Sequence, residues 1–103
     1  MNAHTLRNRA IRAARRFFEQ RQILEVRTAK AVKAAAMEPY IDAFALSGNG
    51  QTTELRLATS PEMAMKKSFA VELENNAGAA GIYEIAPVFR DDPATKNHAQ
   101  EFT

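Results

Sequence analysis

The most chemically specific residues of the sequence lie in its last stretch. Arg90 ends the apolar run "IYEIAPVFR", and a polar loop with Asp91, Asp92 and His98 leads to Phe102 in "HAQEFT". A guanidinium held by a strand is a rigid bidentate donor for phosphate oxygens. A phenylalanine on the neighbouring strand offers a flat face to a purine base. Spacing alone leaves a second interpretation open, a surface salt bridge between Arg90 and the two aspartates.

Other common chemistries find no support in the residue pattern. His4 and His98 lie far apart and the chain has no cysteine, which argues against a zinc site, so no metal ligands are predicted. Ser60 has no general base nearby in the sequence, and a helix-capping role accounts for it more simply than nucleophilic catalysis. No Gly-rich phosphate loop follows a strand, which argues against a Rossmann or P-loop nucleotide site.

Composition places the chain among soluble globular proteins. It has 103 residues, of which 46% are hydrophobic and 25% charged, as expected for one small domain. The sequence contains neither an apolar run long enough for a membrane nor a signal peptide, and the lack of cysteine suits a cytoplasmic protein. Seven arginines fall in the first 27 residues. They indicate either a solvated helix face or a surface for nucleic acid or an acidic protein.

The first half of the sequence predicts a long helix followed by strands. Apolar residues recur at helical spacing from Leu6 to about Gln22, with Thr5 as the predicted N-cap. The segment "ILEVR", 23–27, predicts a strand that follows the helix directly. Residues 28–37 fit either a helix or an irregular connection, and a hairpin is expected over 40–58 with "SGNG" as its turn.

The second half begins with the clearest helix start in the chain. Ser60 can cap the helix, Pro61 suits its first position, and Glu62 places negative charge at the positive end of the helix dipole. Its apolar residues, including the methionines and Phe69, are expected to fill core. A strand over 82–90, with Pro87 at an edge or bulge, and a return strand at "HAQEFT" complete the pattern. Hairpins rather than crossovers favour an α+β fold, an antiparallel sheet flanked by helices.

Three segments, in this order, resemble the class II aminoacyl-tRNA synthetases of the lysyl type. The opening "IRAARRFFEQRQILEVRTAKA" is similar to motif 1, a helix that runs into a strand. The segment "LATSPEMAMKKSFA" is similar to the one after the central hairpin, and "FRDDPATKNHAQEFT" resembles motif 2. Together with "EPYIDAF" and "IYEIAPVFR", they look most like the synthetase paralogues that lysylate elongation factor P. Residues 1–103 would then form a single partial catalytic domain that ends inside the motif 2 hairpin, without motif 3.

The resemblance implies a reaction with ATP and assigns the nucleotide-binding residues. In this family an amino acid carboxylate attacks the α-phosphate, giving an aminoacyl-adenylate and pyrophosphate. Arg90 matches the catalytic motif 2 arginine on the α-phosphate, and Asp92 stands where the family has a glutamate near the adenine. His98 matches a histidine on the nucleotide side. Phe102 matches the aromatic ring that stacks on adenine.

The resemblance also implies the remaining substrates and partners. Ser60 and Glu62 belong to the "TSPE" segment that binds the amino acid, lysine in type, with Glu62 receiving its α-amino group. Mg²⁺ would bridge the phosphates through ligands outside this chain. The acceptor would be elongation factor P or a tRNA, and the motif 1 helix would form a homodimer. No membrane partner is expected.

Departures from the family pattern leave alternatives open. Ala29 replaces the motif 1 proline, Asp92 is one methylene shorter than the family glutamate, and Asn97 replaces an arginine near the triphosphate. Without motif 3, these residues alone are not expected to be active. The alternatives are a fragment of a lysyl- or aspartyl-tRNA synthetase, or a non-catalytic dimerisation or binding module with an exposed strand edge.

Overall fold

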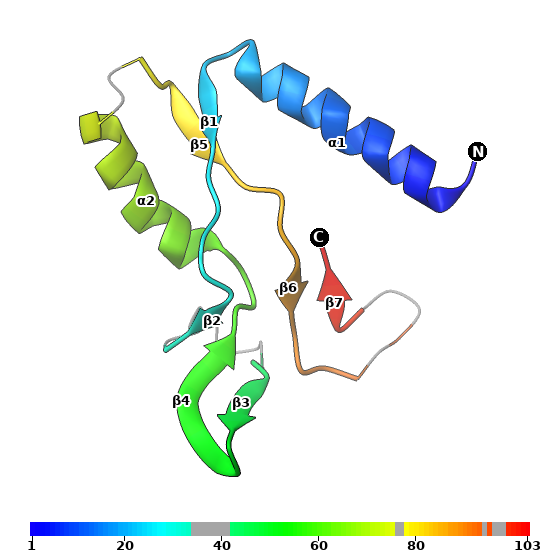
Figure 1. Ribbon diagram of the computed structural model, residues 1–103, viewed down its shortest axis with the longest axis vertical. Helices are drawn as coiled ribbons and strands as arrows, with labels where there is room; N and C mark the ends of the chain where they lie inside the picture. Colours follow the sequence, from blue (N-terminus) through cyan, green and yellow to red (C-terminus); the bar gives the residue numbers. More distant parts are fainter. Residues whose placement is uncertain (34–41, 76–77, 94, 96–98) are drawn as a thin grey trace.

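The computed structural model describes residues 1–33, 42–75, 78–93, 95 and 99–103. Along the described chain a first helix is followed by four short strands and a second helix by three, and three small sheets lie one after another along the long axis (Figure 1). The elements are α1 (Ala3–Glu19), β1 (Ile23–Glu25), β2 (Ala31–Val32), β3 (Ala45–Gly48), β4 (Gln51–Leu57), α2 (Glu62–Asn75), β5 (Gly81–Tyr83), β6 (Val88–Phe89) and β7 (Glu101–Phe102).

Helix α1 forms as the apolar spacing predicts, but it begins three residues earlier, at Ala3. Its N-cap is Asn2, whose Oδ1 accepts a hydrogen bond from the Thr5 backbone N–H at 2.9 Å. The predicted cap at Thr5 is therefore wrong, because Thr5 lies inside the first turn. After the helix, Gln22 takes a positive φ of 58°, which turns the chain directly into β1 as the sequence predicts.

Strand β1 pairs with β5 in parallel, with Ile23 opposite Gly81 and Glu25 opposite Tyr83. The predicted strand 23–27 is confirmed in type and is shorter than expected. The expectation of an antiparallel sheet is wrong for this pair. Its two strands lie far apart in the sequence and are joined through α2 and the second sheet, and no local hairpin signal announces such a pairing.

The central hairpin is confirmed in the second sheet, where β4 lies between β2 and β3 and pairs antiparallel with both. Asn49 and Gly50 form its turn with φ values of 52° and 73°. Two positive φ values in a two-residue loop match the twist of a hairpin, which explains the Asn-Gly pair. The turn is tighter than "SGNG", because Ser47 and Gly48 belong to β3. Strand β2 lies within 28–37, and residues 34–41 fall outside the described part of the chain.

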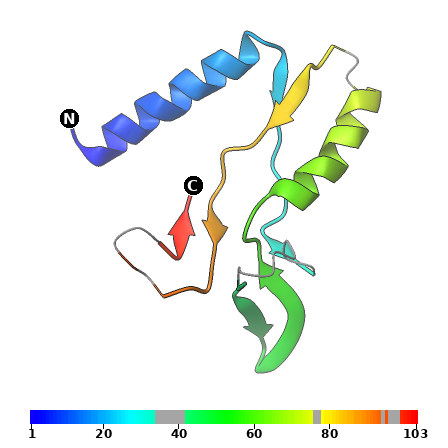
Figure 2. The ribbon, with the colours of Figure 1, turned by 180° about the vertical axis from the view of Figure 1, so that it is seen from behind.

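Helix α2 starts where the sequence predicts. The Glu62 backbone N–H donates to Ser60 Oγ at 3.2 Å, so Ser60 satisfies a donor at the helix start. The predicted core role of its apolar side is not met among the described residues, since no α2 residue is buried and Phe69 is 38% exposed. Helix α2 covers only one side of β5, so much of the surface of α2 stays open (Figure 2).

The predicted strand over 82–90 divides into two. Its first part, β5, pairs with β1, and its last part, β6, pairs antiparallel with β7, placing Val88 opposite Phe102. Pro87 lies between them and has no N–H to donate to a ladder. The chain can therefore leave one sheet and enter another within four residues. The return strand at the chain end is confirmed as β7.

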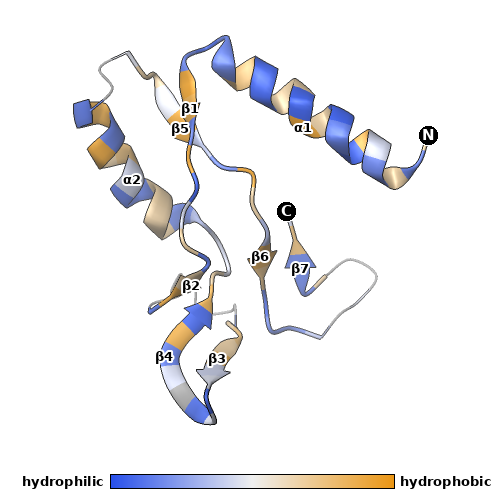
Figure 3. Ribbon diagram, in the orientation of Figure 1, coloured by the Kyte–Doolittle hydropathy of each residue, from blue (hydrophilic) through white to orange (hydrophobic). Residues whose placement is uncertain are grey.

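The buried core of the described residues is small and lies where the sheets meet. It contains Ala58 and Val88 together with two polar residues, Thr28 and Thr59. The radius of gyration is 16.2 Å, whereas a compact chain of this length has about 13 Å. Figure 3 shows apolar residues on β1, β5 and α2, and Leu24 and Leu73 are among those exposed. No described helix has the length and apolarity needed to cross a membrane.

Candidate functional site

A cavity of about 410 Å³ lies where the start of α2 faces the segment that leads from β5 to β6. One wall comes from residues before α2, and the other from the segment around Pro87 together with both strands of the β6–β7 pair. Its lining consists of Thr59, Ser60, Pro61, Glu84, Ile85, Ala86, Val88, Arg90, Phe102 and Thr103. Three of the residues predicted from the sequence, Ser60, Arg90 and Phe102, are therefore brought to one cavity.

Arg90 and Phe102 lie on the same face of the β6–β7 pair. Val88 stands directly opposite Phe102, so their side chains lie on one face of the pair. Arg90 is two residues after Val88 and therefore projects from the same face. The guanidinium carbon of Arg90 lies 5.0 Å from the centroid of the Phe102 ring, a cation–π distance. The ring is 40% exposed and can be reached from the solvent.

The backbone and side chain of Arg90 are held by separate contacts. Its N–H donates to the Gln100 carbonyl at 2.9 Å, which extends the β6–β7 ladder by one residue. Its Nε–H donates to the Thr59 carbonyl in the opposite wall at 3.5 Å, the long end of the hydrogen-bond range. Among the described residues neither Asp91 nor Asp92 forms an ion pair with Arg90. The salt-bridge interpretation is thus not realised, and Arg90 lines the cavity.

The two residues predicted for the amino acid separate in the structure. Ser60 lines the cavity. Glu62 does not appear among the described lining residues, and its carboxylate pairs with Lys66 Nζ at 3.1 Å on the exposed surface of α2. Their side chains are 58% and 69% exposed. A role for Glu62 in binding an ammonium group would require this exposed ion pair to open, which costs little.

Of the two other residues predicted to bind the nucleotide, the structure describes only Asp92. Asp92 is half-buried beyond the end of β6, and its backbone carbonyl accepts a hydrogen bond from Gln100 Nε2 at 2.9 Å. His98 lies outside the described residues.

A residue that sequence reasoning missed, Glu84, occupies the wall of the same cavity. Its side chain is 1% exposed, and it accepts hydrogen bonds from the Thr28 N–H at 2.6 Å and from Thr28 Oγ1 at 2.7 Å. Lys30 Nζ donates to it at 3.0 Å. The sequence did carry a signal for Glu84, since it is the one charged residue in the apolar run "IYEIAPVF". A carboxylate buried in such a run requires hydrogen-bond donors from elsewhere in the chain.

The environment of Glu84 favours its charged form. Burial by itself raises the pKa of this carboxyl, whereas the hydrogen bonds from Thr28 and the Lys30 ammonium lower it. The contacts outweigh burial, so the pKa of Glu84 lies below its ordinary value. In the opposite wall Thr59 is 1% exposed, and its Oγ1 has no hydrogen-bond partner among the described residues.

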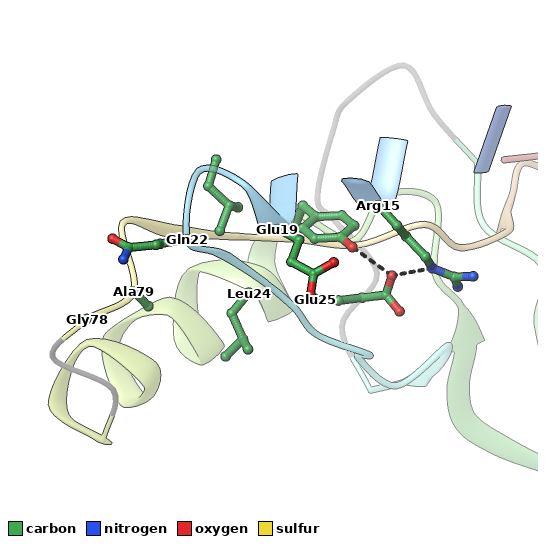
Figure 4. A pocket seen from close by; sticks show the side chains of 9 residues that line it. Arg15, Glu19, Gln22, Leu24, Glu25, Gly78 and Ala79 are labelled. Atoms are coloured by element: carbon green, nitrogen blue, oxygen red, sulfur yellow. Dashed lines mark hydrogen bonds and ion pairs between the residues drawn. The ribbon is translucent and has the colours of Figure 1, made fainter. Parts of the chain in front are cut away.

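A second cavity, of about 470 Å³, lies between the end of α1, β1 and the turn before β5. Figure 4 shows the Arg15 side chain reaching Glu25, with Nε to Oε2 at 2.8 Å. The Tyr83 hydroxyl donates to the same carboxylate oxygen at 2.9 Å. The Phe18 ring stacks on Tyr83 at a centroid distance of 4.1 Å. This network connects α1 with β1 and β5, and none of its residues lines the cavity of Arg90.

The same network shifts the titration of its members. The hydrogen bond from Arg15, followed by that from Tyr83, holds the pKa of Glu25 below its ordinary value. Burial, and then the hydrogen bond to Glu25, raises the pKa of the Tyr83 phenol. Since Arg15 and Glu25 are 50% and 41% exposed, water screens their ion pair.

The first cavity has the means to bind a phosphorylated aromatic compound. It offers a guanidinium whose terminal nitrogens can donate to phosphate oxygens and an exposed phenyl ring for stacking. It offers no metal site, because the described residues contain no group of three or more His, Cys, Asp or Glu that could hold an ion.

Comparison with known proteins gives a family match over the whole chain. The profile of the family described as tRNA synthetases class II (D, K and N) matches residues 1–103.

Curated relatives match nearly all of the chain. Similar proteins named elongation factor P–(R)-β-lysine ligase occur in Pseudoalteromonas translucida (strain TAC 125), at 34% identity over 96% of this chain, and in Vibrio vulnificus (strain YJ016), at 36% over 95%. The protein of the same name from Haemophilus influenzae (strain ATCC 51907 / DSM 11121 / KW20 / Rd) is 35% identical over 97%. The matched region covers 31%, 30% and 30% of these relatives, so the chain spans about a third of their length.

Proposed function

Because this chain belongs to the class II tRNA synthetase family of the D, K and N type, we propose that it binds ATP for the activation of a lysine-type amino acid. The observation that carries the proposal is the juxtaposition of Arg90 and Phe102 over one cavity. In the proposed reaction an oxygen of the amino acid carboxylate attacks the α-phosphorus of ATP. The bond from that phosphorus to the bridging oxygen breaks, and pyrophosphate leaves.

Arg90 is the residue proposed to act on the α-phosphate. Charge builds up on the phosphate oxygens as the new bond forms, and a fixed guanidinium stabilises that charge without having to reorganise. The backbone bond to Gln100 and the contact to Thr59 limit where Arg90 can lie. The chain need supply no nucleophile, so positioning and charge neutralisation are its contribution.

Phe102 is proposed to stack on the adenine. In the described state the Arg90 guanidinium covers one face of the ring at 5.0 Å. A base that stacks on this face takes the place of the guanidinium, which then becomes available to the phosphates. Asp92 and His98 are proposed to contact the nucleotide from the loop between β6 and β7.

The amino acid and the acceptor follow from the relatives' printed name. Those proteins are named for (R)-β-lysine and for elongation factor P, so we propose a lysine-type substrate and elongation factor P as acceptor. Ser60 and Glu62 are proposed to bind the amino acid, with Glu62 leaving Lys66 to meet the α-ammonium. Transfer to a tRNA is the alternative acceptor reaction, and the protein is proposed to work in the cytoplasm.

Mg²⁺ fits this proposal only as a partner of the nucleotide. The described residues provide no acidic cluster to hold it. When bound, the ion would neutralise phosphate charge, and no step is assigned to it here.

Activation can be tested by exchanging segments with a relative. The aligned segment of the Vibrio vulnificus ligase is replaced by residues 1–103, and pyrophosphate exchange into ATP is measured with lysine or (R)-β-lysine. Exchange that depends on the amino acid is expected, and Arg90→Ala should abolish it while Arg27→Ala, which changes an exposed arginine outside the cavity lining, preserves it. A folded chimera that exchanges no pyrophosphate with either amino acid would contradict the proposal.

A dimerisation role is a second candidate, supported by different observations. Helix α1 has no buried residue, and Leu6 and Phe17 are 62% and 49% exposed. Leu24 of β1, which lines the second cavity, is exposed as well. We propose that two copies associate through α1 and β1, either as part of an enzyme or as a binding module.

A further inference from the structure

The carboxylate of Glu84 joins two parts of the chain that are distant in sequence. Its oxygens accept from the backbone and hydroxyl of Thr28 and from the ammonium of Lys30. Lys30 Nζ also donates to Thr28 Oγ1 at 2.9 Å, so the three residues form a closed cluster. With a side chain only 1% exposed, Glu84 depends on these donors, because a buried carboxylate without them is strongly unfavourable.

The cluster is continuous with the strand that carries Arg90. The Lys30 carbonyl accepts from the Ala58 N–H at 2.8 Å, and the Ala58 carbonyl accepts from the Phe89 N–H at 2.9 Å. Thr59 follows Ala58 and Arg90 follows Phe89, and these two residues are also in contact, through the Thr59 carbonyl and Arg90 Nε. The segments 28–30, 58–59 and 84–90 therefore form one closed loop of contacts around the cavity wall.

Among the described residues, no other hydrogen bond or ion pair of this kind holds the segment between Glu84 and β6. Residues 84–87 belong to no strand, and Pro87 has no N–H. Its course is set at one end by Glu84 and at the other by Val88 and Phe89, which pair with β7. Arg90 lies six residues after Glu84, so a shift at Glu84 is passed along this short segment.

We propose that Glu84 is a positioning residue: with Thr28 and Lys30 it fixes the segment that carries Arg90 and so sets where the guanidinium lies in the cavity. The inference rests on the proposed function for its nucleotide readout. Glu84 does not itself receive the substrate, because both of its oxygens are occupied by donors from this chain.

The test compares two threonine variants of the full chain. Thr28→Val removes one hydrogen bond to Glu84 and keeps the backbone N–H. Thr53→Val is the matched control, since Thr53 Oγ1 also makes a half-buried hydrogen bond, to the Leu46 carbonyl at 2.8 Å, within the second sheet. ATP affinity is measured by calorimetry, and the Arg90 Nε–H resonance by ¹H–¹⁵N NMR without nucleotide.

Thr28→Val is expected to weaken ATP binding about tenfold, since small displacements of a binding group have large effects, and to shift the Arg90 Nε–H resonance. Thr53→Val should change neither. A fall in thermal stability without a change in the resonance would overturn the proposal, because Glu84 would then be merely structural. If the parent chain binds no ATP, the proposed function fails, while a shifted resonance in Thr28→Val still supports the positioning role.

Lys30→Met gives a second variant if Thr28→Val does not fold. It keeps both bonds from Thr28 and removes only the ammonium, whose side chain is 22% exposed. The resonance of Arg90 Nε–H is expected to shift in this variant also. An unchanged resonance in a folded Lys30→Met protein would overturn the proposal.

Discussion

Individual side chains have two roles around the cavity, ligand binding and the positioning of the binding groups. Arg90 and Phe102 present the groups that a nucleotide would need, and Glu84 fixes the wall that carries one of them. The sequence indicated the first kind, because a guanidinium at a strand end and a nearby ring have recognisable chemistry. It did not indicate the second kind, because the partners of Glu84 are more than fifty residues away in the chain.

Phe102 gives a direct prediction for base stacking. Phe102→Leu removes the aromatic face and keeps an apolar side chain, so ATP affinity should fall about five- to 150-fold, as base–aromatic stacking contributes about 1–3 kcal/mol. Phe102→Tyr keeps the ring and is expected to bind ATP like the parent. Calorimetric titration with ATP and with inorganic triphosphate separates the effects. An equal loss for both ligands in Phe102→Leu would speak against a stacking role.

Glu84 gives a prediction for stability against pH. Its pKa is lowered in the folded chain from the ordinary value of 4.5, so its stabilising contribution is present above about pH 4.5 and is lost as the pH falls further and the folded carboxyl takes up a proton. Thermal unfolding followed by circular dichroism should show a midpoint that decreases below this pH. Thr28→Val should reduce that dependence, whereas Thr53→Val should leave it as in the parent. An identical dependence in all three proteins would contradict the cause assigned here.

Among the elements, those with local signals were predicted and those formed by distant pairing were not. The helix over 62–75 follows from Ser60 and Pro61, and the central hairpin from Asn49 and Gly50, because these residues act on their immediate neighbours. The parallel β1–β5 pair has no such signal. Likewise, Asn2 competes with Thr5 for the helix cap, and only the geometry of the first turn decides between them.

The turn between β3 and β4 gives a prediction for the stability of the hairpin. Gly50 has a φ of +73° and a Cβ added there would meet no atom within 4 Å, so the cost of Gly50→Ala is purely conformational. It should lower the free energy of unfolding by about 1–2 kcal/mol. Gly48→Ala is the matched control, since it also meets no atom within 4 Å and has no positive φ. Urea unfolding measures both, and equal stability of the two variants would exclude the turn assigned here.

The whole molecule is open rather than compact. Its described core is small, and apolar side chains of α1, α2 and β1 remain exposed. Contiguous exposed apolar surface is typical of contact sites. For α1 the sequence indicated an apolar face, but periodicity indicates only that a face is apolar and not what covers it.

For the whole molecule, we predict that two copies associate through α1. Leu6→Ser combined with Phe17→Ser should convert a dimer into a monomer of 11.4 kDa in sedimentation velocity, because these side chains form the proposed surface. Met63→Ser combined with Val71→Ser is the control, as both residues are similarly exposed on α2. A parent chain that sediments as a monomer, or a dimer lost only in the α2 variant, would contradict association through α1.

The central claim is that Arg90 and Phe102 form the nucleotide site, and the most direct measurement is a calorimetric titration of the full chain with ATP. The parent chain should bind, and Arg90→Ala should weaken binding about tenfold or more, as hydrogen bonds between charged groups contribute about 1.5–3 kcal/mol. Arg27→Ala, which removes the same charge from an exposed position, should bind like the parent. A parent chain that binds no ATP, or an Arg90→Ala variant that binds it unchanged, would contradict the claim.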